Sequence, residues 1–119
     1  MNSDLINEYI KYYIEVYNDK NRFNEFINLW SEHSTLIYDN TTYKNQELIV
    51  LLTQLYTCSI SNTNLNISYM IVGDRRVNIL LSYILIDNLT NSKNVSQYIQ
   101  LAFSNDKKYW IHSSLININ

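Results

Sequence analysis

The hydrophobic pattern of this chain changes its period once, near residue 62, and this change constrains the fold more than any other feature. Before it, apolar residues recur every three or four positions, which is typical of amphipathic helices. After it, apolar and polar residues alternate, as in strands that bury one face. Helices first and strands last predict one α+β domain over residues 1–119, with the helices on one face of a curved sheet.

Three helices are expected. Residues 4–17, between the cap candidate Ser3 and a break at residues 18–20, carry two adjacent apolar stripes, which indicates a helix packed on more than one side. Asn21 is expected to cap a second, shorter helix that presents Phe23 and Trp30 on one face. Asn45 is expected to cap a third helix over residues 46–56.

The strands follow the change of period. Residues 34–39 should be extended and end in a turn that carries Asp39. Residues 57–62 read as a polar connection, and four strands should then form an antiparallel meander to the C-terminus. The turns between them are expected at residues 73–75, 87–93 and 104–107.

Composition excludes several classes of function. The net charge is −2 with 17% charged residues and no block of like charge, so a direct grip on nucleic acid is not expected. The apolar runs are too short to span a bilayer, and the N-terminus lacks the basic start of a secretory signal, so no membrane role is expected. One cysteine, Cys58, and two histidines cannot form a disulfide or close a structural zinc site, so we expect no metal and no cofactor.

Glycine and proline are almost missing: the chain has one Gly and no Pro. Turns still require residues that tolerate the left-handed backbone region, and asparagine does so best after glycine. We therefore expect asparagines to occupy the turn positions that glycine takes in most proteins.

Several segments together resemble the nuclear transport factor 2-like family. The stretch S-T-L-I-Y-D-N-T-T-Y-K-N over residues 34–45 resembles the family's strand–Trp-Glu-Gly–strand–Gly element. Tyr38, Asp39 and Asn40 stand in the Trp-Glu-Gly places, and Asn45 stands in the last Gly place. Residues 5–17 resemble the first helix, and Ser96-Gln97 resembles a Ser-Gln-hydrophobic strand. The resemblance implies a cone-like curved antiparallel sheet with the N-terminal helices on its concave face.

Within the family, the nearest resemblance is to members that carry Ran-GDP and touch phenylalanine–glycine repeats of nucleoporins. It implies a protein of the cytoplasm and nucleus, found at the pores of the nuclear envelope. It also implies roles for single residues. Asp39 would pair with a basic Ran residue, and Tyr38 would line the cavity that receives a Ran phenylalanine. The remaining partner-binding positions would be Leu55, Ile116 and Ile118 on the cavity rim and Asp87 in the acidic loop.

Family members of this kind form homodimers by packing sheet against sheet. The exposed sheet face of this chain is therefore expected to be a semi-polar patch that pairs with a second copy. The residues predicted for this interface are Tyr83, Tyr98, Gln100 and Trp110.

Two other functions remain open from the sequence. The small subunit of the mRNA export heterodimer shares the fold and pairs with a larger, like-folded partner. Cone-cavity enzymes such as ketosteroid isomerase need a carboxylate base in the cavity, for which Asp39 is the candidate, with Tyr12 or Tyr13 as the proton donor. Because Gln97 is the one polar candidate on strand 95–103, no second buried acid is expected, and we predict a non-enzymatic protein without catalytic residues.

Overall fold

The structure, a computed structural model, describes residues 3–104 and 108–119. Their helices and strands follow the chain in the order α1 (Ser3–Asn18), α2 (Phe23–Ile27), β1 (Trp30–Tyr38), β2 (Thr41–Lys44), α3 (Asn45–Leu55), β3 (Ser59–Ile60), β4 (Asn66–Val72), β5 (Arg76–Ile86), β6 (Ser92–Phe103) and β7 (Tyr109–Ile118). The predicted turn at residues 104–107 lies largely outside the described residues.

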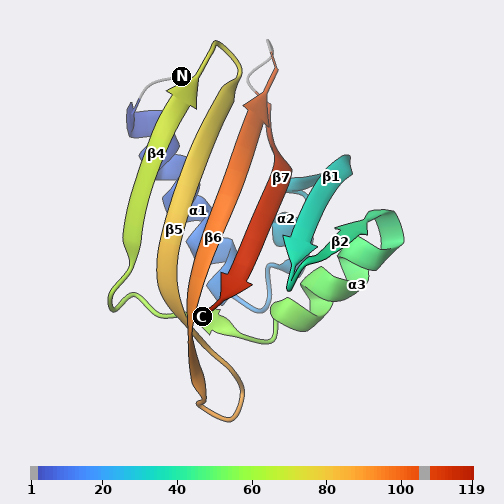
Figure 1. Cartoon of the computed structure of the whole chain (residues 1–119), viewed down its shortest axis with the longest axis vertical. Helices are drawn as coiled ribbons and strands as arrows, with labels where there is room; N and C mark the ends of the chain where they lie inside the picture. Colours follow the sequence, from blue (N-terminus) through green and yellow to red (C-terminus); the bar gives the residue numbers. More distant parts are fainter. Residues whose placement is uncertain (1–2, 105–107) are drawn as a thin grey trace.

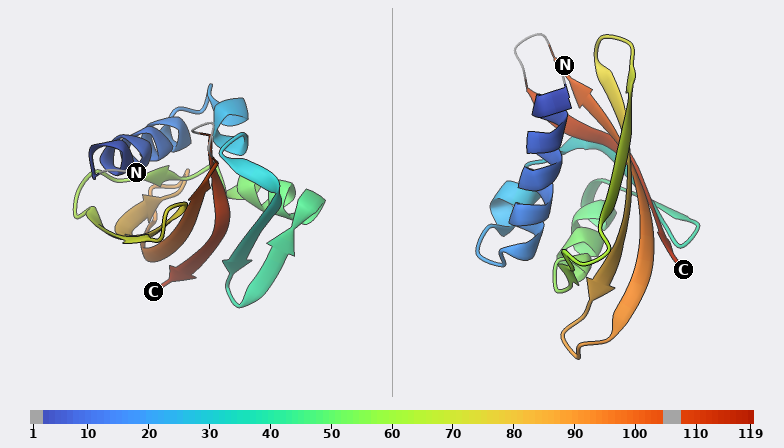
Figure 2. Two further views of the ribbon diagram at one scale, coloured as in Figure 1. Left: turned by 90° about the horizontal axis from the view of Figure 1, so that it is seen from above. Right: turned by 90° about the vertical axis from the view of Figure 1, so that its left-hand side faces the viewer.

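The strands form one sheet in the order β2-β1-β7-β6-β5-β3, and β4 also pairs with β5. The predicted meander is confirmed, because β4, β5, β6 and β7 pair antiparallel in sequence order. The β1–β7 pair is parallel, so the sheet as a whole is mixed. Figures 1 and 2 show a curved sheet with the helices on its concave side, which confirms the predicted α+β architecture.

Two irregularities interrupt the regular strand pairing of the sheet. The β1–β7 register shifts between Trp30 and Thr35, and the β6–β7 register shifts between Gln100 and Leu101. The first is held by Ser34, whose hydroxyl donates to the Ile111 carbonyl. Such bulges increase local twist and bend a strand, which helps close the sheet around the helices.

Alternate residues of the long strands face the helices and form the core. On β5, Val77 and Ile79 are fully buried, and on β6 the same holds for Leu101. They meet the buried stripe of α1 and an aromatic cluster between the helices, which brings together Tyr13, Tyr17, Phe26, Trp30 and Tyr56. The wide apolar face predicted for the first helix is confirmed, since seven residues of α1 are buried.

Both predicted asparagine caps are wrong. Arg22 stands at the N-cap of α2 and Lys44 at that of α3, and neither helix start has a side-chain cap hydrogen bond. The second helix is also shorter than predicted, because Trp30 already belongs to β1 and pairs with β7. A helical pattern and a buried strand end are hard to distinguish over so few residues.

The connection at residues 57–62 contains a short strand that the sequence did not predict. In β3, Ser59 and Ile60 pair with the end of β5. Asn18 at the end of α1 holds this segment, because its side chain accepts from the Ile60 N–H at 2.8 Å and donates to the Ile60 carbonyl at 2.9 Å. This contact ties the C-terminus of α1 to the edge of the sheet.

Candidate functional site

A small cavity lies inside the curve of the sheet, between the sheet and the helices. Its volume is about 10 Å³, roughly room for one water molecule. The walls come from all three helices and from β1, β5 and β7, and they consist of Tyr13, Tyr17, Phe26, Trp30, Tyr38, Leu52, Leu55, Tyr83, Leu85, Ile116 and Ile118. The cone is therefore almost completely filled by its own side chains.

Four of the predicted partner-binding residues line this one cavity: Tyr38, Leu55, Ile116 and Ile118. Ile116 is buried, whereas Tyr38 and Leu55 are half-buried and Ile118 is exposed. Side chains from β1, α3 and β7 thus meet where the cavity approaches solvent. The fold brings together residues that lie far apart in the sequence.

Asp39 lies beside this group, in the turn between β1 and β2, and is exposed. Burial raises the pKa of the Tyr38 phenol, and the negative charge of Asp39 raises it further. The turn requires left-handed backbone at Asp39 and Asn40, with φ of 50° and 64°, and Asn45 at the start of α3 has φ 55°. Asn40 and Asn45 occupy the two places where the family element has glycine, so the prediction that asparagine takes glycine's role is confirmed there.

Asp87 is placed differently. Its carboxylate accepts hydrogen bonds from the backbone N–H groups of Leu89 and Asn91 at 2.9 and 3.0 Å, and from the Asn91 side chain at 3.2 Å. Loss of solvation acts to raise the pKa of Asp87, but these hydrogen bonds outweigh it and lower the pKa. The carboxylate thus closes the β5–β6 loop, which Figure 1 shows extending beyond the rest of the sheet. Asp87 does not line the cavity.

A buried polar network connects the cavity wall to the strands. Gln97 is 2% exposed, and its carbonyl accepts from the Tyr83 hydroxyl at 2.8 Å. Its amide group donates to the Tyr13 hydroxyl at 3.2 Å and to the Ser114 hydroxyl at 3.1 Å. Ser114 in turn donates to the Tyr98 carbonyl at 2.8 Å. One glutamine thereby satisfies three buried hydroxyl groups, which holds α1, β5, β6 and β7 in one arrangement.

The arrangement needed for proton transfer does not form around Asp39. The described residues that line the cavity include no carboxylate and no histidine. Asp39 faces solvent, and the phenol of Tyr12 donates to Glu25 at 2.9 Å on the outside of the helices. Tyr13 does reach the cavity, where burial raises the pKa of its phenol to about 12. The cavity therefore offers neutral phenols but no base.

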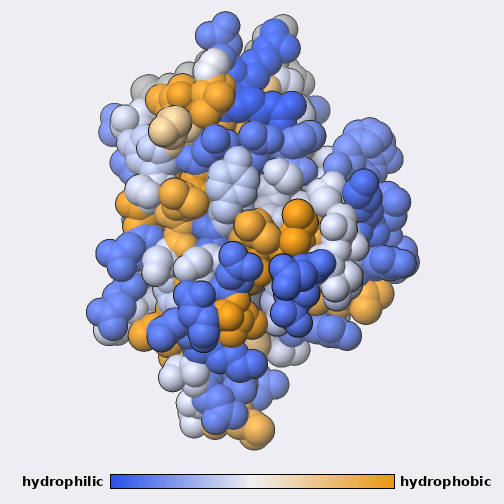
Figure 3. All heavy atoms as spheres, in the orientation of Figure 1, coloured by the Kyte–Doolittle hydropathy of each residue, from blue (hydrophilic) through white to orange (hydrophobic). Residues whose placement is uncertain are grey.

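The convex face of the sheet, called the outer face below, is built from the other set of alternating residues on β4 to β7. Tyr98, Gln100 and Trp110 lie on this face, where the sequence predicted them, and each is half-buried. Their role in a dimer interface stays a prediction. Figure 3 shows apolar patches among polar ones on this face. A groove of about 400 Å³ crosses it, lined by residues of β4, β5, β6 and β7 that include Leu80, Tyr98 and Leu115.

The prediction of Tyr83 on this face is wrong. Tyr83 is 6% exposed, lines the cavity on the opposite side of the sheet and donates to Gln97. Burial raises the pKa of its phenol well above the usual value. Both faces of β5 are apolar in sequence, so alternation alone does not show which of them meets the helices.

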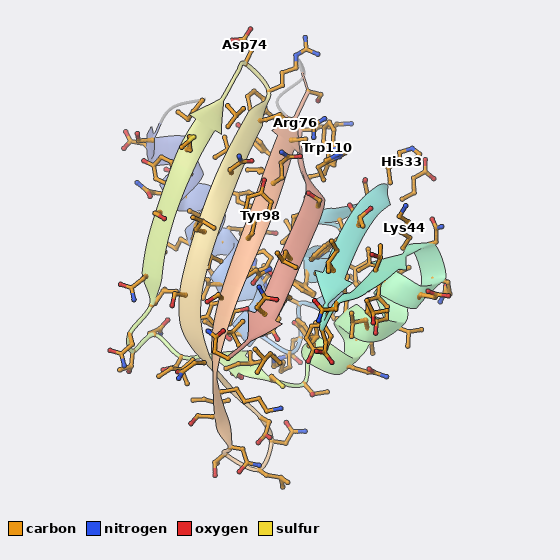
Figure 4. All side chains as sticks on the ribbon, viewed as in Figure 1. His33, Lys44, Asp74, Arg76, Tyr98 and Trp110 are labelled. Carbon is orange, nitrogen blue, oxygen red and sulfur yellow. The ribbon has the colours of Figure 1, made fainter. Side chains whose placement is uncertain are left out.

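Arg76 is a residue of the outer face that the sequence reading missed. It is half-buried, and its Nη1 atom is enclosed without a hydrogen-bond partner. Figure 4 shows Arg76, Trp110 and Tyr98 on the face turned to the viewer. Burial and the positive charge of Arg76 both lower the pKa of His112. A sequence signal existed, because Arg76 directly precedes the alternating residues of β5 and so falls on the outer side.

No Asp or Glu is found among the residues that β4 to β7 direct to the outer face within the described part of the chain. These residues are Asn66, Ser68, Met70, Val72, Arg76, Asn78, Leu80, Ser82, Ile84, Ile86, Ser92, Asn94, Ser96, Tyr98, Gln100, Ala102, Trp110, Ser113, Leu115 and Asn117. An enclosed guanidinium nitrogen without an acceptor is costly, and such exceptions call for an explanation. The described residues that these strands direct to the outer face therefore offer no acidic counterpart for Arg76.

Residues 3–104 and 108–119 contain no group of three or more His, Cys, Asp or Glu side chains that could hold a metal ion. None of the helices in this part is long and apolar enough to cross a membrane.

The fold and the filled cone identify a class of structure. No family model matches this sequence, and no curated protein matches it. Several of the solved structures that match are nuclear transport factor 2-like proteins, and this chain has that fold.

Three solved structures illustrate the likeness. Nuclear transport factor 2 of Cryptosporidium parvum is 13% identical, with a TM-score of 0.79 over 95% of this chain and 90% of that one. An NTF2-like protein of Cytophaga hutchinsonii is 10% identical, with a TM-score of 0.76 over 100% of both chains. The association domain of Caenorhabditis elegans CaMKII is 9% identical, with a TM-score of 0.70 over 96% of this chain and 93% of that one.

Proposed function

We propose that this protein is a non-enzymatic nucleocytoplasmic transport factor that binds Ran-GDP and phenylalanine–glycine repeats of nucleoporins. It would work in the cytoplasm and nucleus and at nuclear pores. The observation that carries the proposal is the cavity rim, where Tyr38, Leu55, Ile116 and Ile118 meet beside the exposed carboxylate of Asp39. The structural likeness to nuclear transport factor 2 of Cryptosporidium parvum supports it.

Binding at this rim would require the cavity to open. The present space of about 10 Å³ cannot hold a phenyl ring. Tyr38 is half-buried at the mouth, so rotation of its side chain would make room for an aromatic residue of the partner. Asp39 would attract a basic partner residue and contribute more to association rate and specificity than to affinity.

Binding of purified Ran tests this proposal, with the GTP form as the control for nucleotide selectivity. We expect the wild-type protein to bind Ran-GDP and to ignore Ran-GTP. Asp39→Lys should weaken binding roughly tenfold or more, because it reverses a rim charge. Glu8→Lys makes the same charge change on an exposed site of α1 and should leave binding unchanged. Absence of GDP-selective binding by the wild type would reject the Ran role.

A second candidate function is favoured by Arg76. A subunit of a heterodimer, such as the small subunit of the mRNA export heterodimer, would place the outer face against a larger, like-folded partner. A partner that presents a carboxylate would pair with the half-buried guanidinium of Arg76, which a second copy of this face would not do, because the described residues of the face include no acid. The word "association" in the name of the CaMKII domain fits a fold that pairs with other chains.

The oligomeric state of the outer face separates the two candidates. If two copies pair through it, Leu80→Lys should break that outer-face contact, because Leu80 is 55% exposed in the groove. If the face belongs to a heterodimer, the isolated chain should not pair through it. Co-expression with a like-folded chain that carries an acid opposite Arg76 should then yield a stable complex, and Arg76→Glu should abolish it.

A further inference from the structure

The strand β4 forms an open edge of the sheet. Among the described residues it pairs with β5 alone, and no strand lies on its other side. Its pairing with β5 is regular over all seven residues, without the register shifts found in β1 and β7. Figure 1 shows β4 at the outermost position, where its free backbone groups can meet another strand.

The usual protections of an edge strand are absent from β4. Residues 59–73 contain no charged residue, no histidine and no proline. Six of the seven residues of β4 are exposed, and four of these are large and apolar, namely Ile67 at 42%, Met70 at 67%, Ile71 at 46% and Val72 at 41%. Long, neutral, apolar edges pair readily with other strands, and natural proteins block them with charges, proline or bulges.

The opposite edge of the same sheet shows such protection. There β2 has only four residues, ends in the exposed Lys44 and runs directly into α3. Figure 4 shows Lys44 at this edge of the molecule. The two edges therefore differ in length and charge, and β4 lacks the protections that β2 has.

We propose that β4 is a self-pairing edge, at which two copies of this chain join their β4 strands antiparallel about a twofold axis at Tyr69. Facing residues of an antiparallel pair lie on the same side of the sheet, so only certain registers are allowed. The register centred on Tyr69 pairs all seven residues of each strand. On the concave side it sets Ile67 against Ile71 of the partner, and on the convex side Ser68 against Met70 of the partner.

This register is self-complementary. Ile67, Tyr69 and Ile71 share the side of Ile79, which is the side of the core, so the joined strands would extend the apolar surface of the core across the junction. No like charges would meet, since β4 has none. The contact lies apart from the cavity rim, so it is compatible with partner binding there, and it shares Asn66, Ile67 and Ser68 with the outer-face groove.

A pair of double variants tests the edge and its register together. Ile67→Lys with Ile71→Lys places lysine opposite lysine at two positions, whereas Ile67→Lys with Ile71→Glu places lysine opposite glutamate at the same positions. Both variants replace the same two residues with charged ones. A difference in self-association between them therefore reports pairing between chains and not the folding of the single chain. We expect sedimentation to show the wild type and the Lys/Glu variant as paired, and the Lys/Lys variant as weaker by about tenfold or more.

Leu80→Lys on the outer face is the matched control, and it should leave edge pairing intact. Equal masses for the Lys/Lys and Lys/Glu variants at every concentration would overturn the proposal. This measurement is made without Ran or nucleoporins. A negative result would therefore not contradict the transport role, and a negative Ran-binding result would not contradict pairing through β4.

Disulfide trapping provides a second measurement if the charged variants fold poorly. In a Cys58→Ser background, a protein with Ser68→Cys is mixed with one that carries Met70→Cys. Facing residues of an antiparallel pair have Cα atoms about 4.5–5.5 Å apart, within the range that disulfides span. The mixture should cross-link and either protein alone should do so far less. Equal cross-linking in all three samples, or none in the mixture, would contradict the proposed register.

Discussion

The two faces of one sheet differ sharply, although they are built from alternating residues of the same strands. The concave face is filled, with a residual cavity of about 10 Å³, and Gln97 joins three of its buried hydroxyls. The convex face carries a groove of about 400 Å³ and an arginine nitrogen without an acceptor. The concave side also encloses two groups without a hydrogen-bond partner, the Tyr9 hydroxyl and Trp30 Nε1. Its packing is nevertheless closed within the chain, whereas the convex side leaves a groove open, so stability should depend on the concave side and association on the convex side.

Truncation of a core aromatic should have the largest effect. Phe26 is 1% exposed and contacts four other aromatic rings. Phe26→Ala should lower the free energy of unfolding by about 3–5 kcal/mol, because a cavity would form that its neighbours cannot fill. Leu80→Ala on the outer face should change it by less than about 0.5 kcal/mol. Urea denaturation measures both, and equal losses would break the contrast between the faces.

Alkaline pH should weaken the concave face next. Burial raises the pKa of Tyr13 to about 12, and burial also raises the pKa values of Tyr9, Tyr17 and Tyr83. The phenol of an unfolded tyrosine has a pKa of about 10. Between pH 10 and 12 the folded protein therefore binds more protons than the unfolded chain. Stability is therefore complete below pH 10 and falls as the pH rises from 10 to 12, by about 1.4 kcal/mol per pH unit for each such tyrosine.

Thermal denaturation at pH 8, 9.5, 10.5 and 11 checks this dependence, with tyrosinate absorbance followed in parallel. We expect no ionisation of the buried phenols until the chain unfolds. A normal titration of all eleven tyrosines in the folded state would contradict the burial of this cluster.

Loss of the network at Gln97 should have an intermediate effect. Gln97→Leu leaves the hydroxyls of Tyr83, Tyr13 and Ser114 with one partner fewer in a dry site, and should cost about 1–3 kcal/mol. Gln100→Leu is the matched control, because Gln100 lies three residues later on the outer face of β6 and should change stability by less than about 0.5 kcal/mol. Chemical denaturation measures the free energy of unfolding of both variants and so compares the concave and outer faces of β6.

Replacement of the outer-face arginine should have the smallest effect on folding. Arg76→Met keeps the apolar stem and removes the enclosed nitrogen, so the free energy of unfolding should stay within about 0.5 kcal/mol of the wild type or rise. Denaturation of the isolated chain measures it. A loss of several kcal/mol would show that Arg76 is satisfied within the chain, and would remove the argument for an acidic partner.

The sequence predicted the fold well and the site unevenly, and the reason differs from residue to residue. Tyr38, Leu55, Ile116 and Ile118 were named from a family resemblance and do lie around one cavity, while their role in binding stays a prediction. Tyr83 was assigned to the wrong face, because both sides of β5 are apolar and only its pairing with β6 determines which side meets the helices. Arg76 was not singled out from the sequence, because the lack of an acid near it on the outer face is evident only from the pairing of four strands.

Local chemistry in the sequence determined where the chain changes from helix to strand, and which asparagines could replace glycine in tight turns. Those properties depend on residue spacing and on the backbone preferences of single residues, which a sequence states directly. The tertiary structure decided how nearly full the cone is, which face of each strand is buried, and which edge of the sheet is open. These properties depend on strand pairing between distant residues, because a shift of one position moves every side chain of a strand to the other face.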